Sequence, residues 1–267
     1  MSGFHPLRAA RRRRILETAP IEEGLWDWAL REHRILHWLK PADASLLREL
    51  STIFLGEKRF EPLGGAKVDD ELKVSVASQA SLLLLGLDAD WYDGFSTIMI
   101  AEREYDVRKR EMDEAGVMHE YDDSFAGESF DLGPVALSRV DIEASGWGDG
   151  YNVVIHEMAH KLDGRDGSYD GAPPLHPGMS RAAWQESFSE AFEDLRRRLD
   201  SPRSRKPRGR ARGASAPRID PYAAESPDEF FAVASEYFYE RPALLKSEYP
   251  AVYEQLALFY RRDPLAG

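Results

Sequence analysis

The sequence contains no cysteine. This absence excludes disulfide bonds, a thiolate nucleophile and any zinc site built from thiolates. A metal ion bound by this chain must therefore use nitrogen and oxygen ligands.

Long hydrophobic runs are also missing. The longest candidate, residues 82–85 with Leu87 nearby, is far shorter than the roughly 20 apolar residues that cross a bilayer. The basic cluster at residues 11–14 is followed by only two apolar residues before Glu17, which leaves no apolar region of a secretory signal. We therefore expect a cytoplasmic protein that does not enter a membrane.

An excess of positive charge is absent as well. The 267 residues carry 35 Lys and Arg against 47 Asp and Glu, a formal net charge of −12. Because nucleic-acid binding gains most of its affinity from Lys and Arg that neutralise phosphates, this balance argues against it. Residues 196–218 hold ten Lys or Arg and could form a nucleic-acid arm. A solvated loop is the favoured interpretation, because this stretch has no aromatic residues that would stack on bases.

Helical periodicity covers most of the chain. Apolar side chains recur every three to four residues, and capping or turn residues border each such segment. The start of the helix at 228–239 is marked by Ser226 as N-cap and Pro227 in the first turn. The predicted helices cover residues 22–39 (closed by Pro41), 43–56 (capped by Asp43 or Ser45), 70–86, 151–163, 181–199, 228–239 and 249–260.

Two short segments predict strands. Residues 95–100 and 134–142 are rich in β-branched or apolar residues and are bounded by Gly, Asp and Pro. The highly charged residues 102–130 between them predict a hairpin or a loop. The expected fold class is therefore α+β, mainly helical with a small sheet.

His156 and His160 carry the strongest chemical signal. They stand four residues apart in a His-Glu-X-X-His motif, so on a helix both imidazoles lie on one face and converge on one ion. Glu157 is offset by one position and suits a general base that takes a proton from a metal-bound water. The pattern predicts a zinc-dependent hydrolase.

The same five residues can arise by chance on the surface of a helix. Against this alternative, residues 151–155 form an apolar run directly before the motif, which predicts a buried helix. Burying two histidines and a glutamate without a metal or hydrogen-bonding partners costs free energy. The context therefore favours a metal site.

A catalytic zinc needs a third protein ligand and one open position. Asp166 could ligate, whereas Asp163 followed by Gly164 is typical of a helix end with the glycine in the left-handed conformation. Asp163 also shares the face of the two histidines and could hydrogen-bond one of them. The better candidates are Glu229 and Glu236, seven residues apart on one face of an aromatic-rich helix. Two solvent-facing carboxylates on a polar stripe are the alternative.

Three segments carry a resemblance to a known family. They are HEMAHKLDG from residue 156, the strand-like GPVALS from residue 133, and DPYAAESPDEFFAVASEYFY from residue 220. With these segments the chain resembles the Mlc titration factor A family of bacterial zinc peptidases, over roughly residues 20–265. It is also similar to the catalytic domain of anthrax lethal factor, and the resemblance implies a zincin-like fold with the sheet next to the helix of the motif.

The resemblance implies roles for further residues. It implies one Zn²⁺ per chain, with Glu229 as the third ligand and Glu236 left for a supporting or structural role. Tyr222 matches a family tyrosine seven residues before that ligand, whose hydroxyl stabilises the oxyanion of the reaction. By analogy, residues 134–142 are the edge strand that holds the substrate in extended form.

The function that follows is peptide-bond hydrolysis of an aminopeptidase-like kind, on a peptide or protein substrate. In enteric bacteria the resemblance also implies binding to the Mlc repressor of sugar-uptake genes. Because the basic residues 201–218 depart from the family pattern, that partner does not follow directly for this chain. The alternative function is a non-catalytic protein that sequesters a repressor and uses zinc structurally.

The domain organisation expected from these patterns is simple. Residues 1–18 are predicted to form a basic flexible tail, because they are rich in arginine and lack apolar periodicity. Residues 19–267 are predicted to form a single zinc metallopeptidase domain with a flexible basic loop at 201–218.

Overall fold

The computed structural model describes residues 6–103, 133–201 and 218–266. Within these ranges most residues are helical and three short strands form one sheet, which confirms the mainly helical α+β class. The α-helices are α1 (Pro6–Thr18), α2 (Glu23–Glu32), α3 (Pro41–Glu57), α4 (Asp70–Leu82), α6 (Arg139–Ala144), α7 (Val153–Asp163), α8 (Arg181–Asp200), α9 (Pro227–Glu240), α10 (Pro242–Glu248) and α11 (Pro250–Tyr260). The 3-10 turns are η1 (Arg34–Leu36), η2 (Ala89–Tyr92), η3 (Gly164–Asp166) and η4 (Pro221–Ala224), and the strands are β1 (Arg59–Pro62), β2 (Thr97–Ala101) and β3 (Val135–Ser138).

The sheet is parallel, with the strand order β1-β2-β3. Ile98 in the middle strand pairs with Phe60 of β1 and Val135 of β3, and its side chain is completely buried. Such burial is typical of parallel strands, whose faces are usually covered by helices. Strand β3 is the last strand of the sheet within the described residues, and it contacts α7.

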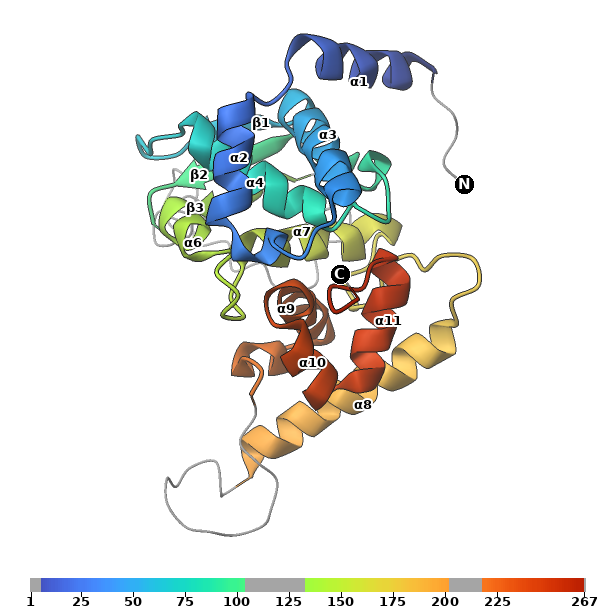
Figure 1. Ribbon diagram of the computed structural model, residues 1–267. Helices are drawn as coiled ribbons and strands as arrows, with labels where there is room; N and C mark the ends of the chain where they lie inside the picture. The colour runs from blue at the N-terminus through green and yellow to red at the C-terminus, as the bar shows by residue number, and fades with distance from the viewer. Residues whose placement is uncertain (1–5, 104–132, 202–217, 267) are drawn as a thin grey trace.

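Helix α7 lies between two groups of helices (Figure 1). The sheet and helices α2, α3 and α4 lie on one side of it, and helices α8 to α11 lie on the other. It contacts α4 in the first group and α9 in the second. Side chains that are far apart in the sequence therefore meet on α7.

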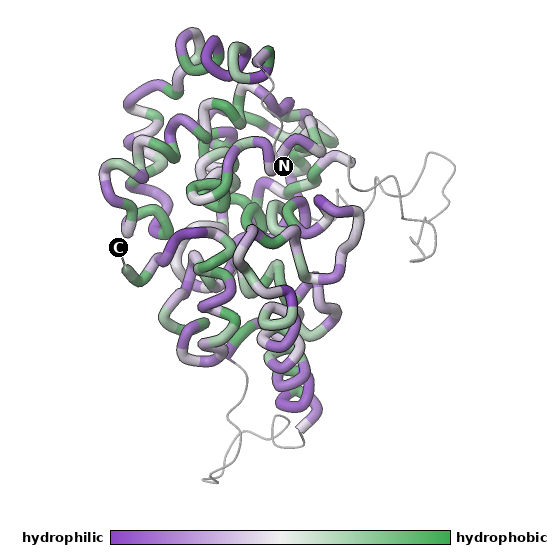
Figure 2. The backbone as a smooth tube through the Cα atoms, turned by 90° about the vertical axis from the view of Figure 1, so that its right-hand side faces the viewer, coloured by the Kyte–Doolittle hydropathy of each residue, from purple (hydrophilic) through white to green (hydrophobic). Residues whose placement is uncertain are grey.

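One continuous hydrophobic cluster runs through both groups. In the second group it is built largely from aromatic rings around α9, which bury large apolar areas and pack edge to face. The projecting end of α8 is mostly hydrophilic, whereas hydrophobic residues gather on the inner segments (Figure 2). The rings of this part of the cluster include Trp184, Phe188, Phe230, Phe231, Phe238, Phe259 and Tyr260.

Helix α1 corrects the prediction of a flexible tail over residues 1–18. From residue 6 onward this segment is helical and packs on α3. Its anchor is Arg12, whose guanidinium lies 2.9 Å from Oε1 of Glu57 and also pairs with Asp90. Both partners are far along the chain, so the local composition of the segment could not reveal them.

The predicted end of α2 was also wrong. The helix expected over residues 22–39 ends at Glu32, because His33 adopts an extended conformation and is followed by the turn η1. Pro41 does not close this helix but begins α3 as its first residue, a position where proline's missing N–H costs nothing. The N-cap is Lys40 rather than Asp43 or Ser45.

The other predicted elements agree with the structure to varying degrees. Helices α3, α4, α7, α8, α9 and α11 and strand β2 were predicted, whereas the short helix α10 was not. The strand expected over residues 134–142 stops at Ser138, whose hydroxyl accepts a hydrogen bond from the N–H of Asp141 and starts α6. The segments predicted as loops at 102–130 and 201–218 lie almost entirely outside the described residues. No helix in the described part of the chain is long and apolar enough to cross a membrane.

Candidate metal centre

Helix α7 presents the two histidines of the motif on one face. The helix begins after Asn152, whose Oδ1 accepts a hydrogen bond of 2.9 Å from the N–H of Ile155. Ile155 and Met158 are completely buried in the core. His156 and His160, one turn apart, point to the remaining face and are largely but not fully buried.

Helix α9 supplies the third side chain. As predicted, Ser226 is the N-cap and Pro227 the first residue, and the hydroxyl of Ser226 accepts a hydrogen bond from the N–H of Glu229. Tyr222 lies in the preceding turn η4, which Asp220 caps by accepting a hydrogen bond of 2.9 Å from the N–H of Tyr222. Both residues are thus held by local capping at the start of α9.

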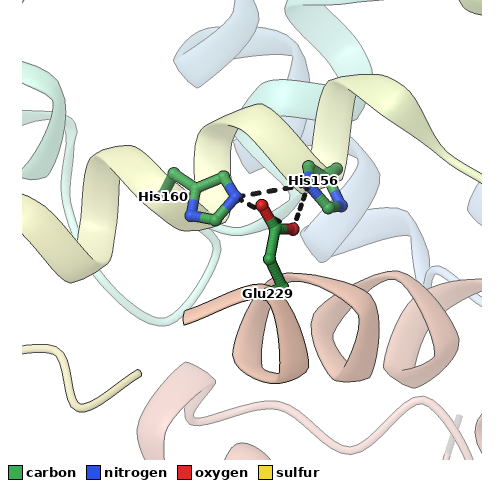
Figure 3. A group of neighbouring side chains, drawn as sticks. All are labelled: His156, His160 and Glu229. Atoms are coloured by element: carbon green, nitrogen blue, oxygen red, sulfur yellow. Dashed lines mark hydrogen bonds and ion pairs between the residues drawn. The ribbon is translucent and has the colours of Figure 1, made fainter. Parts of the chain in front are cut away.

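The three predicted ligand side chains converge (Figure 3). Figure 3 shows Glu229 reaching from α9 toward His156 and His160 on α7. Oε2 of Glu229 is 3.1 Å from Nε2 of His156 and 3.6 Å from Nε2 of His160, and the two Nε2 atoms are 3.2 Å apart. One ligand atom from each residue lies within 4.8 Å of the others. The chain therefore brings together two imidazoles and one carboxylate from segments about 70 residues apart.

The electrostatics of the cluster favour a cation. Burial lowers the pKa of His156, but its contacts with Glu229 and Glu236 more than compensate and raise this pKa to about 10. Burial raises the pKa of Glu229, yet His156 and His160 hold it well below its usual range. The carboxylates that favour the protonated form of His156 would equally attract a divalent cation in place of that proton.

Glu236 orients His156 from behind. Its Oε1 lies 2.9 Å from Nδ1 of His156, and its side chain is only 6% exposed. An imidazole whose Nδ1–H donates to this carboxylate presents the unprotonated Nε2 to the space between the ligands. This agrees with the supporting position that the family resemblance implied for Glu236.

The residues present fit a metal ion. Oε2 of Glu229 is buried, and its partners within the described residues are the two imidazoles, at ion-pair distances of 3.1 and 3.6 Å without good hydrogen-bond geometry. A cation between Oε2 and the two Nε2 atoms would satisfy this buried oxygen and both imidazoles in their neutral form. Two imidazole nitrogens and one carboxylate oxygen form a ligand set that zinc accepts in catalytic sites.

Glu157 and Tyr222, the predicted catalytic residues, border this cluster. Glu157 is half-buried on α7, next to His156, and its charge contributes to raising the pKa of both His156 and Tyr222. The hydroxyl of Tyr222 donates a hydrogen bond of 3.1 Å to Oε1 of Glu229. Burial and the neighbouring Glu229 raise the pKa of Tyr222 to about 12, so the hydroxyl stays protonated and remains a donor at neutral pH.

Helix α7 ends at Asp163, as predicted, but Gly164 has a φ of −65° and is not left-handed. A Cβ on Gly164 would come within 2.5 Å of the ring of Tyr169, which packs against it. The left-handed residue is Gly167, after the extra turn η3. Asp166 lies outside the cluster, and its carboxylate accepts hydrogen bonds from Ser168.

Asp163 does not hydrogen-bond either histidine. Its Oδ2 accepts a hydrogen bond of 2.9 Å from the N–H of Gly171, and its Oδ1 has no partner within the described residues. Burial raises its pKa to about 7. Its role is to hold the segment that follows α7 against the helix end.

Sequence reasoning missed three residues around the site: Gln79, Asn152 and Glu240. The side-chain amide of Asn152 donates to Oε1 of Gln79 at 2.7 Å and to Oε1 of Glu240 at 2.8 Å. The available signal was the spacing of Glu236 and Glu240, which places two acidic residues one turn apart on a helix rich in aromatic and apolar residues.

The chain is similar to known proteins over most of its length. A family model described as glucose-regulated metallo-peptidase M90 matches residues 7–261. The chain is 35% identical to Mlc titration factor A of Escherichia fergusonii over 240 residues, which cover 90% of this chain and 86% of that protein. It is 34% identical to the protein of the same name from Enterobacter sp. (strain 638) over 249 residues, covering 93% and 90%, and 34% identical to that from Klebsiella pneumoniae (strain 342) over 240 residues, covering 90% and 86%.

Proposed function

The chain belongs to the family of glucose-regulated metallo-peptidases M90, and from this premise we propose that it is a zinc-dependent, aminopeptidase-like peptidase. The observation that carries the proposal is the convergence of His156, His160 and Glu229, whose ligand atoms lie within 4.8 Å of one another. The substrate is a peptide or a protein, and the enzyme acts in the cytoplasm.

The proposed ligands are the two imidazole Nε2 atoms and the carboxylate of Glu229. When bound there, a zinc ion supplies Lewis acidity, which lowers the pKa of a water to about 7 and polarises the carbonyl of the scissile bond. A ligand set of one carboxylate and two neutral imidazoles leaves a fourth position for solvent.

Glu157 is the proposed general base. It follows His156 directly on α7 and remains partly accessible, so it can receive the proton of the attacking water and deliver it to the leaving amine. Tyr222 is the proposed oxyanion donor. It is 51% exposed, its ring centroid is 6.0 Å from that of His156, and its hydroxyl keeps its proton at neutral pH.

Strand β3 is the proposed docking edge for the substrate backbone. It contacts α7, and only one of its edges, the one toward β2, is paired within the described residues. A peptide that pairs with the other edge would lie extended beside the motif helix.

The variant Glu157→Gln tests the proposed chemistry. Glutamine keeps the shape of the side chain but cannot accept the proton, so hydrolysis of a fluorogenic aminoacyl substrate should fall about 10²–10⁴-fold. Zinc content, measured by atomic absorption, should stay at one ion per chain, because Glu157 is not a ligand. The matched control is Glu186→Gln, an exposed glutamate on α8, which should leave both quantities unchanged. Full turnover in the Glu157→Gln enzyme would remove the proposed base.

A second function is supported by the name of the relatives, Mlc titration factor A, which identifies Mlc as their partner. We propose that this chain also binds an Mlc-like repressor and thereby regulates sugar uptake. Binding of a purified Mlc protein by Glu157→Gln at the affinity of the unmodified chain would separate this role from catalysis. Absence of binding by both proteins would reject it.

A further inference from the structure

Asn152 is the centre of a buried polar network at the start of α7. It is completely buried, and its whole side chain is hydrogen-bonded. Oδ1 accepts from the N–H of Ile155, and Nδ2 donates to Gln79 at 2.7 Å and to Glu240 at 2.8 Å. Its backbone N–H donates to Oε2 of Glu236. One residue thus caps α7 and binds both buried glutamates of α9.

Glu240 is bound by amide donors only. Besides Asn152, it accepts hydrogen bonds from the N–H groups of Gly146 and Gly148, in the loop before α7. Both glycines have positive φ, of 92° and 77°, which turns their N–H groups toward one carboxylate. Within the described residues no Lys or Arg pairs with Glu240, although the residue is only 6% exposed. A carboxylate buried at such cost holds the loop and Asn152 in place.

The contacts align two stripes of side chains on antiparallel helices. On α7, Asn152, His156 and His160 follow one another at intervals of four residues, which places them on one face. Their partners on α9 run in the opposite order. Asn152 meets Glu240, His156 meets Glu236, and both histidines meet Glu229.

The position of Glu229 relative to the histidines depends on the register of these two helices. A shift of α9 along α7 would move Glu236 from Nδ1 of His156 and Glu229 from both Nε2 atoms at the same time. Among the described residues, the far ends of the two stripes are joined by one hydrogen bond between side chains, from Asn152 to Glu240.

We propose that Asn152 and Glu240 are positioning residues of the metal centre, which lock the register of α7 and α9 so that Glu236 and Glu229 meet the two histidines. This inference rests on the proposed zinc site. The two residues do not touch the metal or the substrate; they act through His156 and Glu229.

The variant Asn152→Ser tests the role of the amide. Serine is an equally good N-cap, so α7 keeps its start, but both amide donors are lost. Zinc affinity, measured on the full chain by competition with a chromogenic chelator, should fall about tenfold, a size typical of residues that support metal ligands. The visible absorption spectrum of the Co²⁺-loaded protein should change, because it reports the ligand geometry.

The matched control is Ser180→Ala. It removes the N-cap of α8, where the Ser180 hydroxyl accepts from the N–H of Ala183 at 3.2 Å, and touches no residue of the network. It should lower the melting temperature without changing zinc affinity or the Co²⁺ spectrum. Because Ser180→Ala lowers stability without altering the network, it separates a positioning effect from a general loss of stability.

A reciprocal pair tests the contact itself. Asn152→Asp keeps the cap but sets a carboxylate against Glu240, so zinc affinity should fall. Adding Glu240→Gln to this variant reverses donor and acceptor across the same contact, and part of the zinc affinity should return.

Zinc binding within twofold of the wild type in both Asn152→Ser and Asn152→Asp would overturn the positioning role alone. Failure of the unmodified chain to bind zinc would overturn the proposed function together with it.

Discussion

At the scale of single residues, His33 is an imidazole buried without partners. It is 4% exposed, and neither ring nitrogen makes a hydrogen bond within the described residues. Its ring packs edge to face on Trp28, and Gly146 lies so close that a Cβ there would be 2.8 Å from Nδ1. Burial lowers the pKa of His33 to about 4, so the folded protein holds the neutral form.

This residue should make the protein sensitive to acid. The pKa of His33 is lower in the folded state than in the unfolded state. The free energy of unfolding is therefore unaffected by this residue above about pH 6.5 and decreases as the pH falls toward 4. At pH 5 the cost is about 2 kcal/mol of unfolding free energy. In His33→Phe, which keeps the ring contact, the loss of stability between pH 7 and pH 5 should be smaller by that amount.

Urea unfolding at the two pH values measures this difference. The control is His37→Phe, because His37 is exposed and its replacement should leave the pH dependence of the wild type. An identical pH dependence in wild type and His33→Phe would show that His33 is charged in the folded state or that water reaches it.

At the scale of elements, Gly171 allows the segment after α7 to pack closely against the first residue of α9. Gly171 has a φ of 74°, and its N–H and carbonyl are held by Asp163 and by Nε1 of Trp184, each at 2.9 Å. A Cβ on Gly171 would lie 2.4 Å from the carbonyl oxygen of Pro227, the first residue of α9. The start of α9 therefore packs directly against the segment that follows α7. The contact is at Pro227, two residues before Glu229.

Gly171→Ala should displace this helix start. The left-handed conformation alone costs a residue with a side chain about 1–2 kcal/mol, and the contact with Pro227 adds to it. Because Glu229 lies in the first turn of α9, zinc affinity should fall as well. Gly178→Ala is the matched control, with a φ of 96° and nothing within 4 Å of the added Cβ. Equal stability and equal zinc affinity in the two variants would contradict the role of Gly171.

At the scale of the whole molecule, the proposed metal centre draws its ligands from α7 and from the second group of helices. His156 and His160 lie on α7, which packs on α4, whereas Glu229 belongs to α9 in the second group (Figure 1). An ion held by all three residues links the groups and binds only the folded state. Such binding stabilises by about 4 kcal/mol when the free metal is 1,000 times its Kd.

Removal of the metal should therefore lower the melting temperature. For a chain of this size we expect a decrease on the order of 10 °C when zinc-loaded protein is treated with a chelator. The Glu229→Ala variant should bind little zinc, because it lacks one of the three ligands. The chelator should therefore change its melting temperature very little. An unchanged chelator response in Glu229→Ala would reject Glu229 as a ligand.

The elements predicted correctly are those whose signals are local. Helix α9 has its cap, its proline and its aromatic face within one stretch of sequence, and α7 has the apolar run before His156. The errors occurred where distant residues decide. Helix α1 pairs with Glu57 and Asp90, and the left-handed glycine after α7 is Gly167, which follows the extra turn η3, rather than Gly164.

By itself the sequence indicated the proposed metal chemistry, because the spacing of His156 and His160 on a helix places both imidazoles on one face whatever the rest of the chain does. The family resemblance favoured Glu229 over Glu236 as the third ligand and added Tyr222. Only the tertiary structure decided how closely Glu229 approaches the histidines and which buried groups support them. That distance depends on the register of two helices, and we propose that the register is set by the hydrogen bond between Asn152 and Glu240, 88 residues apart, which no local pattern encodes.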